Sequence, residues 1–341
     1  MSVVLYETVN IKNVSIDQSV INQQCIQQTT AGGIMSYQTQ CIIVLQQIQL
    51  TNSIMTSQSI ESFALSAAII GVTNLGNRRP NMQLSETQVN LQTIFVLNTT
   101  VSTSTLNHTK YIITAGICAY NFMSIDTIQN VVIQNSTLNA NLRASGVFGV
   151  YSNSTATLSN IRIKLCVIST DGYSQSFTGG YIAETVLATV SMLSCSISNT
   201  KISGNIQQSG NVMSAGVIAS IYRSKFTFVD VTTKNLLLIS NGSDVYSGSL
   251  VGSFSTDVDQ VKVRVESCSF QSTNIVFTSS VNSHVSNSIQ LFSMTTALFD
   301  VTVVNSETFG FSYVNGVRIG NCPELKTQVA AGAYLESQTG C

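Results

Sequence analysis

The chain has 341 residues, of which 44% are hydrophobic and only 9% are charged, and its formal net charge is -1. This composition excludes intrinsic disorder, which combines low hydrophobicity with high net charge. The 15 Lys and Arg residues are spread over the whole length, so the sequence has no basic stripe of the kind that binds nucleic acid.

In chain order, the first predicted element is a strand over residues 9–16, where apolar and polar residues alternate. A cluster of small residues follows at 31–34, and a second alternating segment at 48–54. These two elements then recur along the chain, and a third apolar patch, such as 236–239, closes a repeat. Short period-two runs rich in Val, Ile, Thr, Phe and Tyr predict β-strands. No apolar run reaches the roughly 20 residues that a membrane-spanning helix needs, and residues 1–7 read as β structure, not as a secretory signal.

The repeat is clearest at the third position of each small-residue cluster. Counted there, successive clusters are 35, 48, 30, 34, 36, 33 and 39 residues apart. The long step contains residues 77–80, and an insertion at one corner of a coil explains it. The positions that define this repeat are Gly33, Ala68, Gly116, Gly146, Gly180, Gly216, Ser249 and Ser288.

The repeat predicts an all-β fold, a single right-handed parallel β-helix of about eight to nine coils of roughly 34 residues. Each coil is expected to hold three short strands and three corners, with Asn and Ser side chains forming ladders at the corners. The small residues are expected to allow close backbone approach and unusual φ angles. We expect residues 1–320 to form the solenoid and residues 321–341 to form a C-terminal cap or tail. Residues 323–338 fit either a short helix or an irregular coil.

The small-residue clusters resemble the GLUG repeat, in which a Gly-Gly-apolar-apolar-Gly strand precedes a turn and a Ser/Asn-rich strand. Residues 145–149 and 247–252 match it best, whereas 31–36 and 178–183 lack the final Gly. The resemblance covers roughly residues 30–290. It implies an adhesin-like role in display at a cell surface or outside the cell.

The sequence offers few candidates for catalysis or metal binding. Asp257 and Asp259 are two residues apart and would share one face of an extended segment, where they could bind Ca²⁺ or act as an acid pair; the alternative is a solvated loop. Polysaccharide-active enzymes need clustered carboxylates, and the further candidates for such a cluster are Asp230, Asp300 and Arg264. His108 and His284 lie in polar segments that read as surface corners.

The eight cysteines show no CxxC or zinc-like spacing, and we interpret them as small buried hydrophobes. Cys322 and Cys341 bracket the tail and are the pair expected to form a disulfide if one is present. We expect no cofactor.

The sequence therefore favours a non-catalytic structural or adhesive protein that presents a neutral polar surface to a glycan or protein partner, with no nucleic acid and no membrane span. Two alternatives stay open: a polysaccharide lyase or hydrolase, and an ice-binding solenoid, although the Thr residues show no regular recurrence. We expect an extracellular or cell-surface location if the chain is part of a longer protein, and a cytoplasmic one otherwise.

Overall fold

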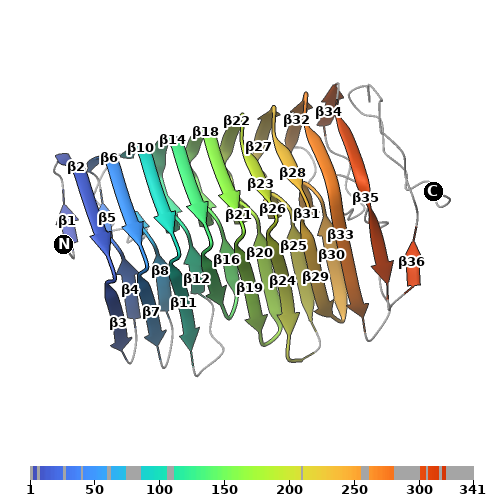
Figure 1. Cartoon of the computed structure of the whole chain (residues 1–341), viewed down its shortest axis with the longest axis horizontal. Helices are drawn as coiled ribbons and strands as arrows, with labels where there is room; N and C mark the ends of the chain where they lie inside the picture. The colour runs from blue at the N-terminus through green and yellow to red at the C-terminus, as the bar shows by residue number, and fades with distance from the viewer. Residues whose placement is uncertain are drawn as a thin grey trace.

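A computed structural model gives the fold of the chain. It describes residues 3–5, 8–25, 28–39, 41–59, 63–73, 86–105, 111–208, 210–254, 261–279, 300–304, 306–314 and 317–319. In this part of the chain all regular structure is β-strand, and the strands stack as the coils of one right-handed parallel β-helix (Figure 1). The predicted fold class is confirmed.

Each coil begins with two successive strand segments that belong to one large sheet. We call the first of these segments the first arm and the next one the second arm. The described strands form the first arm of nine coils, in agreement with the predicted number of coils. Its strands are β2 (Thr8–Asp17), β6 (Ile42–Thr51), β10 (Thr87–Leu97), β14 (Ser124–Gln134), β18 (Thr155–Lys164), β22 (Thr189–Leu193) with β23 (Ser196–Ser198), β27 (Lys225–Val229) with β28 (Thr232–Lys234), β32 (Lys262–Glu266) and β34 (Asp300–Val304).

The second arm follows the first after a sharp bend and belongs to the same 21-stranded sheet. Its strands are β3 (Val20–Cys25), β7 (Ile54–Ser59), β11 (Thr100–Thr105), β15 (Thr137–Ala140), β19 (Val167–Gly172), β24 (Lys201–Ile206), β29 (Leu237–Gly242), β33 (Ser269–Ser279) and β35 (Glu307–Val314). The first three residues of β33 and of β35 continue the first arm, since they align with β28.

Two shorter sheets close the coil. The 7-stranded sheet contains β4 (Gln28–Gly32), β8 (Phe63–Ala67), β12 (Tyr111–Ala115), β16 (Arg143–Ser145), β20 (Gln175–Gly179), β25 (Asn211–Ala215) and β30 (Asp244–Gly248). The 8-stranded sheet contains β1 (Val3–Leu5), β5 (Met35–Thr39), β9 (Ile70–Thr73), β13 (Cys118–Phe122), β17 (Phe148–Ser152), β21 (Ile182–Val186), β26 (Ile218–Tyr222) and β31 (Val251–Phe254).

A complete coil therefore has four strands, and the prediction of three was wrong. The small-residue clusters explain the difference, because each one in the described residues spans the bend between a strand of the 7-stranded sheet and a strand of the 8-stranded sheet. In the fourth coil, for example, β16 ends at Ser145, Gly146 and Val147 form the bend, and β17 begins at Phe148. What reads as one strand in the sequence is two strands joined by a tight bend.

The core fills the inside of the rod as a continuous column of Ile, Val, Leu and Phe side chains. One inward position of the first arm shows the pattern, where Leu45, Leu91, Ile128, Leu158 and Met192 lie in register and are all buried. Each side chain packs on those of the coils above and below it. A single coil could not bury this face alone, so the stacking of coils supplies most of the hydrophobic stabilisation.

The corners are built from residues in the left-handed region, most of them Asn. The bend inside the first arm, corner 1, uses Asn13, Gln47, Thr93, Asn130, Asn160, Ser194, Asp230 and Ser267, with φ between 51° and 59°. The bend between the two arms, corner 2, uses Gln18, Asn52, Asn98, Asn135, Leu165, Asn199 and Asn235. Asn tolerates this conformation better than most residues with a side chain, which explains the predicted Asn-rich corners.

The last described strand departs from the parallel pattern. β36 (Val317–Ile319) pairs antiparallel with β35, with Val314 opposite Val317. The expected cap at 321–341 and the choice between helix and coil for 323–338 concern residues outside the described part of the chain.

Candidate functional site

The repeat positions form a column along the bend between the two short sheets. The N–H of Gly116 donates to Ser145 O at 3.1 Å, that of Gly146 to Gly180 O at 3.1 Å, and that of Gly216 to Gly248 O at 3.1 Å. Gly33, Ala68, Gly180 and Ser249 continue the column, whereas Ser288 lies outside the described residues. These positions hold the coils together and are structural, not part of an exposed site.

The column consists of small residues because two neighbours approach it closely. A Cβ at Gly146 would lie 2.4 Å from Gly180 O in the next coil and 2.4 Å from Ile163 Cδ1 across the core. Gly116 faces Ile133 and Gly180 faces Ile197 in the same way, each 17 positions later in the chain. None of these glycines has a left-handed φ, so the expected unusual φ is wrong and close approach is the reason for glycine.

The structure brings the acidic candidates only partly together. Asp230 lies at corner 1 with φ 53°, not within a strand, and its N–H donates to Glu266 O in the next coil at 3.1 Å. Arg264 forms an ion pair with Glu266 at 2.7 Å, and Asp300 lies opposite Lys262 in the β32–β34 register. Asp257, Asp259, His108, His284, Cys322 and Cys341 are outside the described residues.

Five cysteines, Cys41, Cys118, Cys166, Cys195 and Cys268, are buried and free, as the sequence predicts. Burial raises the pKa of Cys166, Cys195 and Cys268 to about 11, so these thiols stay protonated at neutral pH and are poor nucleophiles. Within the described ranges, no three His, Cys, Asp or Glu side chains come close enough together to hold a metal ion.

A polar surface lies on the outside of the second arm. Asn22, Thr56, Ser102, Asn139 and Ser169 occupy one outward column in five successive coils, in direct register. Thr56 Oγ1 donates to Asn22 Oδ1 at 2.9 Å, and Ser169 Oγ donates to Asn139 Oδ1 at 3.2 Å. We call this column, with the neighbouring Gln24, Gln58, Ser104 and Asn141, the amide–hydroxyl face.

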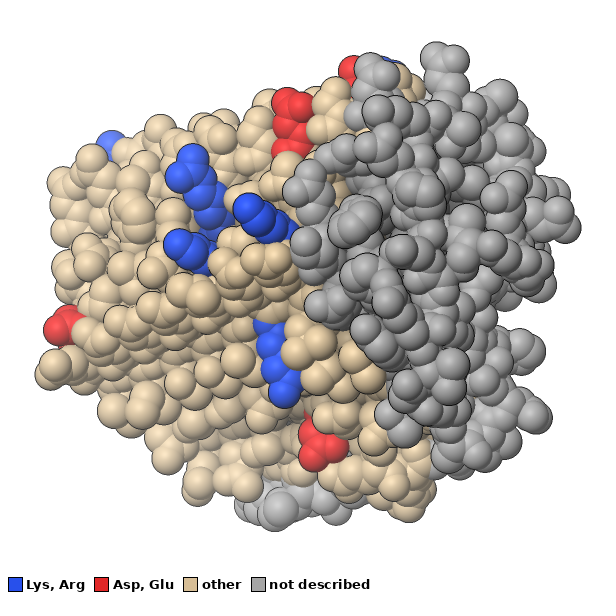
Figure 2. Space-filling model, turned by 45° about the vertical axis from the view of Figure 1, so that its right-hand side comes forward, with Lys and Arg blue, Asp and Glu red and all other residues tan. Residues whose placement is uncertain are grey.

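An apolar column borders this face two residues earlier on each strand. It contains Val20, Ile54, Thr100, Thr137 and Val167, and the three aliphatic side chains are 71%, 46% and 38% exposed. The amide–hydroxyl face therefore runs along the rod beside a column in which three of the five side chains are aliphatic, with strands spaced about 4.8 Å apart. Figure 2 shows one face of the molecule, on which most side chains are uncharged.

Amide ladders also run along the corners. Asn98 Nδ2 donates to Asn52 Oδ1 at 3.2 Å, and Asn52 Nδ2 donates to Asp17 Oδ1 at 2.8 Å. Asn160 bonds Asn130, and Asn235 bonds Asn199, in the same manner. The predicted corner ladders are confirmed, and they hold the surface side chains in fixed positions.

A buried polar cluster between β13 and β14 was missed by the sequence analysis. Asp126 is 1% exposed, and its Oδ2 accepts hydrogen bonds from Asn121 Nδ2 at 2.8 Å and Ser124 Oγ at 2.9 Å. Burial raises the pKa of Asp126 to about 7, and these hydrogen bonds oppose the shift. The site can be recognised only when the coils are aligned, because the alignment places Asp126 in register with the inward-facing Val89 and Ala156.

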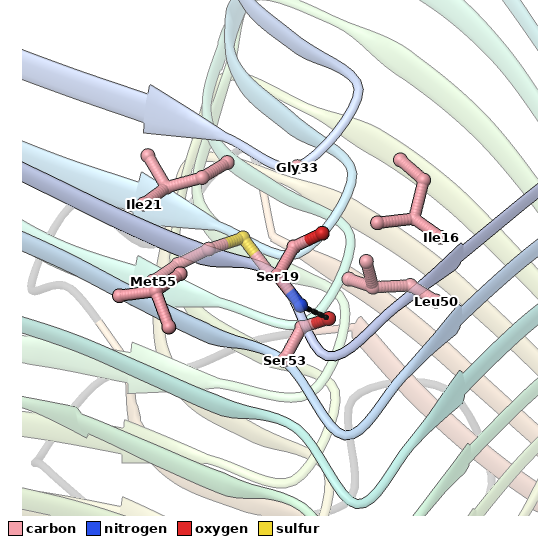
Figure 3. A pocket seen from close by; sticks show the side chains of 8 residues that line it. Ile16, Ser19, Ile21, Gly33, Leu50, Ser53 and Met55 are labelled. Atoms are coloured by element: carbon pink, nitrogen blue, oxygen red, sulfur yellow. Dashed lines mark hydrogen bonds between the residues drawn. The ribbon is translucent and has the colours of Figure 1, made fainter.

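An apolar pocket of about 270 Å³ opens at the N-terminal end of the rod (Figure 3). Ile16, Ile21, Leu50 and Met55 line it, and the N–H of Ser19 donates to Ser53 Oγ across one side at 3.2 Å. Among the described strands, β2 pairs only with β6 and β3 only with β7. The pocket is thus the end of the core, where the first coil has a partner on one side.

The described part of the chain contains no helix that could cross a lipid bilayer. No family model, no curated protein and no solved structure matches this chain.

Proposed function

We propose that this chain is a non-catalytic structural or adhesive solenoid that presents a neutral polar surface to a glycan or protein partner. The amide–hydroxyl face carries the proposal. It offers donors and acceptors in register over five coils, already ordered by their own ladders, so little side-chain entropy is lost when a partner binds.

The apolar column beside the face favours a glycan as the partner. A sugar ring has hydroxyl groups at its edge and C–H groups on its faces, and this surface presents groups complementary to both. The exposed Val20, Ile54 and Val167 supply apolar contacts, and Asn139 and Ser169 supply hydrogen bonds. Many weak contacts of this kind give affinity through repetition and need no deep pocket.

Two in-register polar groups provide the test. We expect Asn139→Ala/Ser169→Ala to lower the affinity of the full chain for the glycans that it binds by about tenfold or more. The lost hydrogen bonds are worth about 1.4 kcal/mol together. The control is Thr157→Ala/Ser191→Ala, which removes two in-register hydroxyls from the first arm and should change affinity less than about twofold. Glycan arrays and calorimetry measure both.

Two results would overturn the proposal. One is a chain that binds neither a glycan nor a protein partner. The other is cleavage of a bound glycan, detected by chromatography, because a polysaccharide-active enzyme would then be the better account. The enzyme alternative has weaker support, since Asp230 lies at corner 1 and the side chains of Arg264 and Glu266, which are 59% and 36% exposed, pair with each other.

An ice-binding role is the second candidate, and one observation favours it. The expectation that Thr residues do not recur in register is wrong, because Thr127, Thr157, Ser191 and Thr227 face outward in four successive coils. The column is interrupted by Ser191 and ends at Arg264, so it is shorter than the amide–hydroxyl face. Measurement of thermal hysteresis in cooled solution separates the two candidates.

A further inference from the structure

Four cations from three successive coils gather near corner 2. Arg162 and Lys164 point outward from β18, Lys201 begins β24, and Lys234 ends β28. Lys164 is in register with Ser198, and Ser198 with Lys234, so the two lysines stand two coils, or about 10 Å, apart. Lys201 lies in register with Val167, just past the same corner. We call these four residues the basic patch.

The cations of the basic patch are exposed and uncompensated. The ion pairs that the structure shows for described residues, Arg143 with Glu184 and Arg264 with Glu266, involve none of them. Their register neighbours are Ser196, Ser198 and Thr232, which are neutral. Figure 2 shows several Lys and Arg side chains near one another on a face where most side chains are uncharged, and a few Asp and Glu side chains are also visible there. A chain with a formal net charge of -1 therefore concentrates positive potential at one place.

The surroundings of the basic patch indicate what kind of anion it suits. Asn199 and Asn235 stand at corner 2 between the cations and are joined by a 3.1 Å hydrogen bond. Exposed aliphatic side chains, Leu165 and Val167, lie beside them. Amides, hydroxyls and aliphatic groups suit the hydroxyls and ring faces of sugars, and the cations suit carboxylate or sulfate groups. Recognition of single-stranded nucleic acid relies on aromatic platforms for the bases, and the basic patch and its register neighbours contain no aromatic residue.

We propose that the basic patch binds an anionic polysaccharide, one that carries uronate or sulfate groups. This inference rests on the proposed function and names the class of glycan for a second surface, next to the amide–hydroxyl face. The glycan lies along the axis of the rod, so that its anionic groups meet Lys164, Lys201 and Lys234 in turn. Its hydroxyls bond the Ser and Asn side chains between the lysines.

The test compares two variants with the same change in net charge. Lys164→Gln/Lys201→Gln removes half of the basic patch, and Lys12→Gln/Lys225→Gln removes two exposed lysines elsewhere. The probes are polygalacturonate, dextran sulfate, uncharged dextran and a single-stranded oligonucleotide, each titrated into the full-length chain at low and moderate salt. Thermal unfolding confirms that both variants are folded.

We expect the patch variant to bind polygalacturonate or dextran sulfate at least about tenfold more weakly, with a smaller dependence of affinity on salt concentration, and the control variant to lose less than about twofold. Equal losses in the two variants would overturn the proposal, because binding would then follow net charge alone. Tighter binding of the oligonucleotide through the same lysines would assign the basic patch to nucleic acid instead.

The two proposals fail in different ways. In one outcome, uncharged glycans bind through Asn139 and Ser169, and the patch variant binds anionic glycans as tightly as the original chain does. The proposed role of the basic patch is then rejected, while the proposed function stands. In the other outcome, Asn139→Ala/Ser169→Ala binds every glycan as tightly as the original chain does, and only the patch variant loses affinity. Glycan binding by the amide–hydroxyl face is then rejected, and glycan binding by the basic patch stands.

Discussion

Asp126 places a buried carboxyl group at an inward position of β14, and the surrounding side chains show how the fold accommodates it. Ser124 and Asn121 donate to one oxygen, and Asn121 is bonded in turn to Thr73. The other titratable groups nearby are Tyr151 and Cys118, whose pKa values are also raised by burial. All of these groups are neutral at pH 5 when Asp126 is protonated, so the cluster then contains no buried charge.

The raised pKa of Asp126 predicts a pH-dependent stability. The folded value is about 7 and the ordinary value is 3.8, so folding favours the protonated carboxyl. Its stabilising contribution is fully present below pH 3.8 and is lost as the pH rises through about 7. We expect Asp126→Asn, which retains an acceptor for Ser124, to be more stable than the original chain at pH 8 by a few kcal/mol and similar at pH 4.

Guanidinium unfolding at both pH values measures this difference. Asp171→Asn is the matched control, because Asp171 is exposed on β19 and its substitution should leave the profile unchanged. If Asp126→Asn lowers stability equally at both pH values, the carboxyl is charged in the folded state and this account of the cluster is wrong.

The glycine column makes a second prediction at the residue scale. A Cβ at Gly180 would lie 1.9 Å from Gly216 O and 2.8 Å from Ile197 Cδ1, so Gly180→Ala must move the backbone of the next coil. We expect a loss of about 1–3 kcal/mol, read from the unfolding midpoint. Ala68→Gly, at a position of the same column where a Cβ is already present, should cost less than about 1 kcal/mol. If the two substitutions changed the stability equally, close approach between coils would not be the reason for small residues in this column.

At the scale of the elements, corner 2 depends on a ladder of buried hydroxyls. The Oγ of Ser136 accepts the N–H of Thr99 at 3.2 Å and donates to Gln134 O at 2.9 Å. Ser19, Ser53, Cys166 and Thr200 occupy the same place in other coils. The side chains of Ser53, Ser136 and Thr200 each accept a backbone N–H of the preceding coil and donate to a carbonyl of their own coil, and all three are buried.

Removing one member of the ladder should be costly. We expect Ser136→Ala to destabilise the chain by about 1–3 kcal/mol, because the N–H of Thr99 is left buried without a partner. Ser136→Thr should cost less, since Thr99 and Thr200 already hold equivalent positions with the same hydrogen bonds. Hydrogen exchange at Thr99 provides the local measurement, and unchanged protection in Ser136→Ala would contradict the role of the ladder.

The sequence predicts the elements well where a periodic pattern has one physical cause. Alternation gives strands, and small residues mark the bend that faces an Ile across the core. The predicted number of strands per coil was wrong, because two strands joined by a tight bend look like one strand in the sequence. The sequence also identifies Cys166 only as a small hydrophobe, whereas its sulfur hydrogen-bonds Lys164 O at a position where other coils use Ser or Thr.

At the scale of the whole molecule, the sequence predicts the rod but not what lies on it. Lys164, Lys201 and Lys234 are 37 and 33 positions apart, which is close to one coil each, so their proximity follows only once the register is known. The amide–hydroxyl face is hidden for the same reason. Asn, Ser and Thr are common throughout the chain, and only stacking selects those that share a column.

The register of the coils underlies every surface described above, and distances along one outward column test it directly. Thr8 lies in the same column as Thr155, Thr189 and Lys225, which are four, five and six coils away. Spin labels attached at Thr8 and at each of these sites through non-cysteine chemistry, measured by pulsed electron paramagnetic resonance, should give backbone separations of about 19, 24 and 29 Å. Separations that do not lengthen by about 5 Å with each added coil would contradict the stacked arrangement and the functional surfaces inferred from it.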